Sequence, residues 1–248
     1  MKRKRISGAD RRSSILEAAR AVFAEHGYEG AKTQQIAAAA KVSEALVYRH
    51  FPSKLALYRA VLRQLIREQN DNFETIGLPE PNTRSLVLTI KAFLRDSLSK
   101  RPTQQEQAAR ILLASLAGDG SYAQLVYRRA VRLMLGRLDD ALEAARAAGD
   151  LAGPPIDSIN AGLFVDHVGS LIAASRLGGR RSIAYQGDDE DVLRDAVWFC
   201  CRGLGLSQQA IEKWYDSEET EAAPDKKAAP AKASSPKPAR QPRRKAGG

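Results

Sequence analysis

Apolar residues recur along this chain at the three- and four-residue intervals of an α-helix. The first such run consists of Ile15, Ala18, Ala19, Val22 and Phe23. Within it, Ser14 and Glu17 have the spacing of a capping box, and Gly27 and Gly30 are residues that end helices. We therefore predict a first helix that follows a basic arm, is capped at Ser14 and ends at these glycines.

Two short helices with a tight turn between them come next. Thr33 is placed to cap a helix that runs to about residue 40, and Ser43 to cap a second that runs to about residue 50. Only Lys41 and Val42 separate the first helix from the second cap. Pro52 ends the second helix, because the residue before a proline resists helical backbone angles.

Longer helical patterns occupy the rest of the folded chain. Ser53 is placed to cap a helix that ends before Gly77, and Thr103 with Glu106 forms a second candidate capping box. The remaining helices are predicted over 83–99, 103–116, 121–148, 157–176, 189–203 and 207–215. No segment alternates apolar and polar residues with the two-residue period of a strand, so the expected fold class is all-α.

Charge divides the chain differently from hydropathy. Of the net charge of +10, residues 1–12 carry +5 and residues 226–248 carry +8, which leaves −3 on the 213 residues between them. Two basic ends indicate a polyanionic partner. We expect a basic disordered arm over 1–9, a DNA-binding domain over 10–56, a helical ligand-binding and dimerisation domain over 57–215, and a disordered basic tail over 216–248.

Several classes of protein are disfavoured by what the sequence lacks. No apolar stretch reaches the length of a membrane span or of a signal peptide's central region, so we expect a cytoplasmic protein. Neither a phosphate-binding loop nor a nucleophile elbow occurs, the three histidines are scattered, and Cys200 and Cys201 are adjacent. We therefore expect no enzyme activity, catalytic residue, metal site or cofactor.

The pair of short helices has the pattern of a helix-turn-helix. Ile36, Ala37 and Ala40 form the apolar face of its first helix, and Val47 and Phe51 bury its second. This arrangement leaves a mostly polar set on the outer side of the second helix, which consists of Glu44, Ala45, Leu46, Tyr48, Arg49 and His50.

At this point the sequence resembles the TetR family of regulators. The resemblance rests on residues 33–54, which read TQQIAAAAKVSEALVYRHFPSK, and on the upstream pieces ILEAA (15–19) and FAEHGY (23–28). It covers about residues 10–65, and beyond them the likeness is one of length and helical character only. The family often has glycine where this chain has Lys41, and a small polar residue where it has Leu46.

The resemblance and the chemistry of the side chains together assign roles in DNA binding. We expect Thr33, Tyr48, His50 and Lys54 to contact phosphates, and Ala45 or Leu46 to meet a thymine methyl group. Glu44 either accepts a hydrogen bond from cytosine or only complements the helix dipole, and Arg49 binds guanine or a phosphate. The full predicted DNA-binding set is Thr33, Gln34, Ser43, Glu44, Ala45, Leu46, Tyr48, Arg49, His50 and Lys54. Arg11 and Arg12 are expected to join the N-terminal arm in contacting DNA.

The family also implies partners for the C-terminal part. The helices at 157–176 and 189–203 are expected to form the surface of a homodimer. Their apolar residues are Phe164, Leu171, Ile172, Val192, Val197, Trp198 and Leu204. Residues 83–205 are expected to enclose a pocket for a small-molecule effector, and its candidate lining residues are Phe93, Tyr122, Tyr127, Phe164, His167 and Trp198. An ordinary place in the core is the more common role for each of these side chains.

The function predicted from these observations is ligand-responsive control of transcription, as a repressor that binds a palindromic operator in double-stranded DNA as a homodimer. No membrane partner is expected. The alternative is a nucleoid-type DNA-binding protein of low sequence specificity, driven by its basic tails. The ratio of affinities for one palindrome and for random DNA distinguishes the two.

Overall fold

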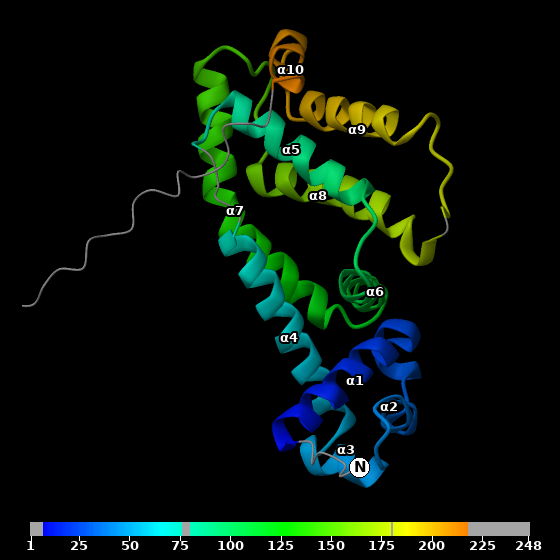
Figure 1. The fold of residues 1–248 in the computed structure, drawn as a ribbon. Helices are drawn as coiled ribbons and strands as arrows, with labels where there is room; N and C mark the ends of the chain where they lie inside the picture. The colour runs from blue at the N-terminus through cyan, green and yellow to red at the C-terminus, as the bar shows by residue number, and fades with distance from the viewer. Residues whose placement is uncertain (1–6, 76–79, 180, 218–248) are drawn as a thin grey trace, which may run out of the picture.

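The computed structural model describes residues 7–75, 80–179 and 181–217. These residues form an all-α fold whose order is α1 (Gly8–Gly30), α2 (Thr33–Ala39), α3 (Glu44–His50), α4 (Lys54–Thr75), α5 (Thr83–Leu98), α6 (Thr103–Ala117), α7 (Ser121–Ala147), α8 (Ser158–Ala174), the short 3-10 turn η1 (Leu177–Gly179), α9 (Asp189–Gly203) and α10 (Gln208–Tyr215). Figure 1 shows α1, α2 and α3 grouped at one end and α5, α8, α9 and α10 at the other. Helices α4 and α7 run between the two ends.

Most of the predicted helix boundaries agree with the structure, and three of the predicted caps, at Ser14, Thr33 and Thr103, are wrong. Helix α1 starts at Gly8, where Ser7 accepts a hydrogen bond from the backbone N–H of Asp10, so the predicted start at Ser14 lies inside the helix. Helix α6 follows Pro102, and no side chain caps it, in contrast to the capping box predicted at Thr103. Helix α1 thus begins at an earlier serine of the same capping chemistry, and in α6 Thr103 is the first helical residue rather than the cap.

A first hydrophobic cluster joins the N-terminal helices to part of the C-terminal ones. It contains the buried faces of α1, α2 and α3, the first three turns of α4, and also Ile111 of α6 and Tyr122 of α7. Phe23 lies at its centre and packs edge-on against Tyr58, with 4.9 Å between the ring centroids. The division predicted at residue 57 remains a prediction, and this cluster crosses that position.

A second cluster forms the core of the opposite end. Helix α5 packs against α7, α8, α9 and α10, and buries Val87 and Leu94 completely. An isolated antiparallel bridge between Leu151 and Leu206 ties the end of α7 to the end of α9. Among the described helices, none is long and apolar enough to cross a membrane. The predicted basic arm up to residue 6 and the tail from residue 218 lie outside the described residues.

Candidate functional site

Helices α2 and α3 form the predicted helix-turn-helix, and their connection is a Schellman turn. The backbone N–H of Lys41 donates to the carbonyl of Ala38, and that of Val42 donates to the carbonyl of Ala37. These two bonds satisfy carbonyls that the end of α2 would otherwise leave unpaired. In a Schellman turn the residue after the C-cap adopts left-handed backbone angles, and here that residue is Lys41, with φ of 54°. The chain therefore places a lysine where the turn favours glycine.

The start of α3 is fixed by its cap, and its outer face is free. Ser43 accepts a hydrogen bond from the backbone N–H of Leu46, as predicted, and Val47 and Phe51 are buried against α1 and α4. On the other side the side chains of Ala45, Tyr48 and Arg49 are exposed, and those of Glu44, Leu46 and His50 are partly exposed. Gln34 of α2 is also exposed. The helix therefore presents a short polar surface outward.

Three of the predicted phosphate ligands make contacts within the protein. The hydroxyl of Tyr48 donates to Oγ1 of Thr33 over 3.3 Å, and Thr33 itself is buried at the first position of α2 rather than capping it. Lys54 donates to the carbonyl of Glu29 and lies over the ring of Tyr28. These contacts fix the side chains beside the outer face of α3.

The two arginines assigned to the N-terminal arm belong to α1. Arg11 and Arg12 lie in the first turns of this helix, because it begins at Gly8. The guanidinium of Arg12 lies 4.7 Å from the ring centroid of Phe51, and this cation–π contact joins α1 to the end of α3. Arg12 therefore borders α3. Of the residues assigned to the arm, those before Ser7 lie outside the described part of the chain.

A buried arginine, which the sequence analysis missed, joins three helices at the base of this region. Arg20 of α1 is 5% exposed, and its Nη1 donates to both carboxylate oxygens of Glu68 on α4, at 2.8 and 2.9 Å. Its Nη2 donates to the carbonyl of Gln104 at the start of α6. Its position in the sequence could have indicated this burial. Arg20 follows Leu16 by four residues and precedes Phe23 by three, so it lies on the apolar stripe of α1.

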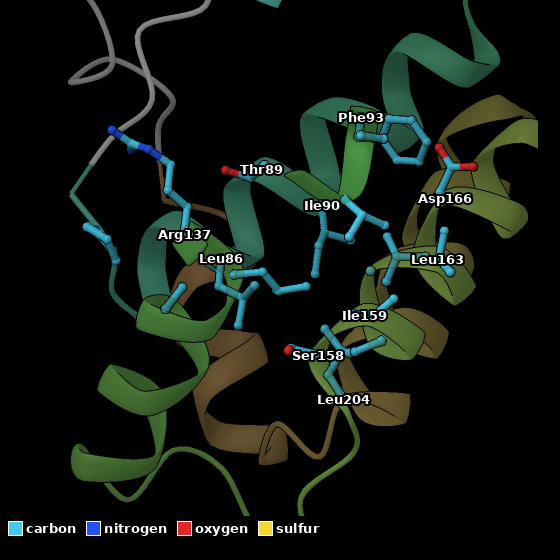
Figure 2. A pocket seen from close by; sticks show the side chains of 18 of the residues that line it. Leu86, Thr89, Ile90, Phe93, Arg137, Ser158, Ile159, Leu163, Asp166 and Leu204 are labelled. Atoms are coloured by element: carbon cyan, nitrogen blue, oxygen red, sulfur yellow. The ribbon is translucent and has the colours of Figure 1, made fainter. Parts of the chain in front are cut away.

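The C-terminal helices enclose a cavity of about 210 Å³ between α5, α7 and α8 (Figure 2). Most of its wall is aliphatic, with Leu86 and Ile90 from α5 facing Ile159 and Leu163 from α8. Helix α7 contributes Ala130, Val131, Leu138 and Ala141. An apolar cavity of this kind with few polar groups is typical of a small-molecule site.

Two of the six residues predicted to line the pocket do so, namely Phe93 and Tyr127. Tyr122 is buried in the first hydrophobic cluster, at the start of α7 and far along the helix from the cavity. Phe164 is 61% exposed on the opposite side of α8, and His167 lies against Tyr127 outside the lining. Trp198 of α9 stacks against Arg202 instead. The prediction named aromatic residues, whereas the cavity wall is mainly aliphatic, and periodicity does not show which face of a buried helix meets a void.

Asp166 and Arg137 are the two charged residues in the cavity wall, which also contains the phenol of Tyr127. Burial raises the pKa of the Asp166 carboxyl, and His167, a hydrogen bond from Ser170 and Arg101 lower it in part. Burial and the nearby Asp166 charge raise the pKa of the Tyr127 hydroxyl. This end of the cavity is therefore a partly desolvated, electronegative place in an apolar surface.

Large apolar side chains are exposed on α8 and α9. Phe164 and Leu171 of α8 are 61% and 58% exposed, one heptad apart on the same face, and Phe199 of α9 is 70% exposed. Ile172 and Val197, which were predicted to add to this surface, are buried within the chain. The two helices thus divide their apolar residues between the chain's own core and an outer face.

Comparison with known proteins identifies the helix-turn-helix. A family model described as bacterial regulatory proteins, tetR family, matches residues 15–61. The HTH-type transcriptional activator FasR of Mycolicibacterium smegmatis is 31% identical over 159 residues, which cover 58% of this chain and 66% of FasR. The HTH-type transcriptional regulator RutR of Escherichia coli is 45% identical over 65 residues, which cover 26% of this chain and 30% of RutR. The matched segments thus span less than two thirds of either relative.

The fold is shared over most of the chain. A crystal structure of a bacterial regulatory protein in the tetR family from Rhodococcus RHA1 aligns with 82% of this chain and 100% of its own, with a TM-score of 0.56 and 22% identity. Salmonella enterica GusR aligns over a similar range, with a TM-score of 0.53 and 20% identity. FasR, RutR and the Rhodococcus protein are named as regulators rather than enzymes, which agrees with the expectation that this chain is not an enzyme. The helix-turn-helix segment thus matches the family model of TetR-family bacterial regulatory proteins, and the all-α fold is the one found in a solved member of that family.

Proposed function

We propose that the protein is a transcription regulator that binds a palindromic operator as a homodimer, and that a small molecule in the α5–α7–α8 cavity releases it. The observation that carries the proposal is the helix-turn-helix, whose α3 is capped at Ser43 and directs Ala45, Tyr48 and Arg49 outward. A short helix held in this way fits the major groove, where its first turn reaches base edges. Thr33, Tyr48, His50 and Lys54 flank it and are proposed to hold phosphates.

The exposed apolar face of α8 and α9 supports the homodimer. One helix-turn-helix reads one half-site, so a two-fold pair is needed to read a palindrome. Phe164, Leu171 and Phe199 would expose most of their area to water in a lone subunit, which is unfavourable for a monomer. Pairing this face with its copy in a second subunit buries all three residues twice.

The Arg20 junction supports communication between the cavity and the DNA-binding helices. Helix α6 follows α5, which lines the cavity, and its first turn accepts the hydrogen bond from Arg20. The same guanidinium binds Glu68 on α4, the helix that follows the helix-turn-helix. A ligand that favours a different position of α6 would thereby change the geometry of α1 and α4, and its differential affinity for the two positions sets the size of the effect.

The first test measures DNA affinity and specificity. Operator fragments are selected from random DNA with the full chain, and binding is compared between the selected palindrome and scrambled DNA at physiological salt. We expect a ratio of at least about 10³, as for specific regulators. Leu46→Ala is expected to change the preference at one base pair in each half-site, whereas Arg132→Ala on the exposed side of α7 serves as the control. Equal affinity for all DNA would instead support a nucleoid-type protein.

The second test concerns assembly. Phe199→Asp is expected to convert a dimer into a monomer in analytical ultracentrifugation, because the charge would be buried unpaired at the proposed interface. Leu125→Asp, at a 51% exposed position of α7, is the matched control and should remain dimeric. A wild-type protein that sediments as a monomer at every concentration would contradict the dimer. A reporter gene under the selected operator then gives the sign of regulation, for which we expect repression.

A further inference from the structure

The cavity has two different ends, and its two charged residues, Asp166 and Arg137, lie apart. Figure 2 shows Asp166 beside Phe93 at one side of the cavity and Arg137 at the other. Arg137 is exposed to solvent, whereas Asp166 is partly buried among apolar residues of α5 and α8. The environment at Asp166 is therefore the one in which a charge has the greater effect on a bound molecule.

The carboxylate of Asp166 is incompletely neutralised by the protein. It accepts a hydrogen bond of 3.3 Å from Ser170, one turn further along α8. Arg101 and His167 act on it electrostatically, but among the described residues no cation lies within ion-pair distance of it. Arg101 instead lies 3.8 Å from Asp96. A carboxylate in such a place has unused acceptor capacity and gains from a positive partner.

The remaining wall selects for an apolar body. Ser85 is occupied in capping α5, where its hydroxyl donates to the carbonyl of Asn82 and accepts from the same residue's N–H. The facing side chains of Leu86, Ile90, Ile159 and Leu163 are hydrocarbon, and Thr89 and Ser158 add two hydroxyl groups to the wall. A strongly polar or anionic molecule would lose more hydration along this wall than these hydroxyls can replace.

We propose that the cavity binds an apolar molecule bearing one cationic nitrogen, with the nitrogen at the Asp166 carboxylate and the hydrocarbon between α5 and α8. This ligand class rests on the proposed function, since it specifies the effector of the same cavity. The phenol of Tyr127 lies near Asp166 and adds an oxygen acceptor to the same end. Phe93 of α5 lies beside Asp166 at this end of the cavity (Figure 2).

Three matched probes test the charge preference directly. Isothermal titration of the full-length protein with phenylbutylamine, phenylbutanol and phenylbutanoate compares a cation, a neutral molecule and an anion of the same apolar body. We expect the amine to bind about tenfold or more tighter than the alcohol, the effect of a charged hydrogen bond, and the acid to bind weakest. Asp166→Asn should remove the difference between amine and alcohol, and Asp166→Glu should retain it. Asp140→Asn, on the exposed side of α7, removes the same charge as a control.

Each other result overturns the proposal. Equal or tighter binding of the alcohol or the acid would place the recognition elsewhere, with the acid pointing to Arg137. A preference for the amine that survives in Asp166→Asn, or no binding of any probe, would do the same. Thermal melts of both variants confirm that they are folded. Operator binding without any probe is measured on the same samples, so that loss of the ligand class is distinguished from failure of the DNA-binding function.

Discussion

Replacing Lys41 with glycine should stabilise the protein, because Lys41 occupies the left-handed position of the turn between α2 and α3. A residue with a β-carbon pays about 1–2 kcal/mol for these angles, whereas glycine adopts them freely. Glycine also loses more backbone entropy on folding, by roughly 0.5–1 kcal/mol. The net expectation is a gain of about 0.5–1 kcal/mol in the free energy of unfolding. For a chain of this size that corresponds to about 1–4 °C in Tm.

The comparison with alanine and asparagine isolates the backbone effect. Lys41→Ala removes the same charge but retains the β-carbon, so its stability should stay close to that of the wild type. Lys41→Asn should fall between alanine and glycine, because asparagine tolerates left-handed angles better than other side chains. Urea unfolding followed by circular dichroism, at one protein concentration for all variants, measures the differences.

The order of the three variants decides the reasoning. If alanine stabilises the protein as much as glycine does, the gain comes from removing a positive charge near other basic residues. If glycine gives no gain, the backbone strain of Lys41 at φ of 54° does not limit the stability of the protein. The same variants also separate the turn from DNA binding, because loss of a lysine that contacts a phosphate would lower the salt dependence equally in all three.

Three further predictions concern buried groups. Glu68→Gln should lower the free energy of unfolding by about 1–3 kcal/mol, because it leaves the Arg20 guanidinium without its anion. Glu17→Gln, on the exposed side of α1, is the control and should be neutral in urea unfolding. Equal effects of the two substitutions would contradict the role of the Arg20–Glu68 pair. Gly169→Ala would bring a β-carbon within 2.7 Å of Cζ of Phe93 and 2.9 Å of Oγ of Ser97, so it should destabilise by about 1–3 kcal/mol and push Phe93 toward the cavity. Gly136→Ala, with no atom within 4 Å, should instead stabilise α7, and a stabilised Gly169→Ala would refute the overpacking. Burial raises the pKa of Cys200 to about 11 and of Cys201 to about 12, so iodoacetamide should modify them only as fast as the chain unfolds, and faster labelling would show access to the native thiols. Because the unfolded chain loses these protons first, stability should fall as the pH rises from 9 toward 11.

The helices that bear the site were predictable because their signals are local. Ser43, Val47 and Phe51 lie within a few residues of each other, and a cap followed by apolar spacing is sufficient to define α3. The cavity was not predictable in the same way, since it depends on how α5, α7 and α8 cross. Tyr127 faces it and Tyr122 does not, although both lie on α7 with similar neighbours. The Arg20–Glu68 pair joins residues 48 positions apart, and no local pattern connects them.

The helix start at Gly8 shows a second limit of local signals. Ser7 and Ser14 have the same capping chemistry, and the helix begins after the earlier one, so that Arg12 lies within it and contacts the ring of Phe51. Ser14 and Glu17, which would suit the start of another helix, therefore lie in the interior of α1. Intrinsic preference sets which ends are possible, and packing against a neighbouring helix selects among them.

Ile111 of α6 and Tyr122 of α7 belong to the hydrophobic cluster around Phe23. The helix-turn-helix segment therefore cannot be transferred to another protein without them. Cut after residue 56, it would lose α4 along with these two side chains, and Ile15 and Phe23 would face water. A chimaera that joins helices α1 to α3 to the C-terminal helices of a relative must therefore also keep the inner faces of α4 and α6 and the start of α7, or redesign them to match. Variation in the proposed DNA preference of such a chain falls most readily on the outer residues of α3, which are exposed or partly exposed and do not belong to that core.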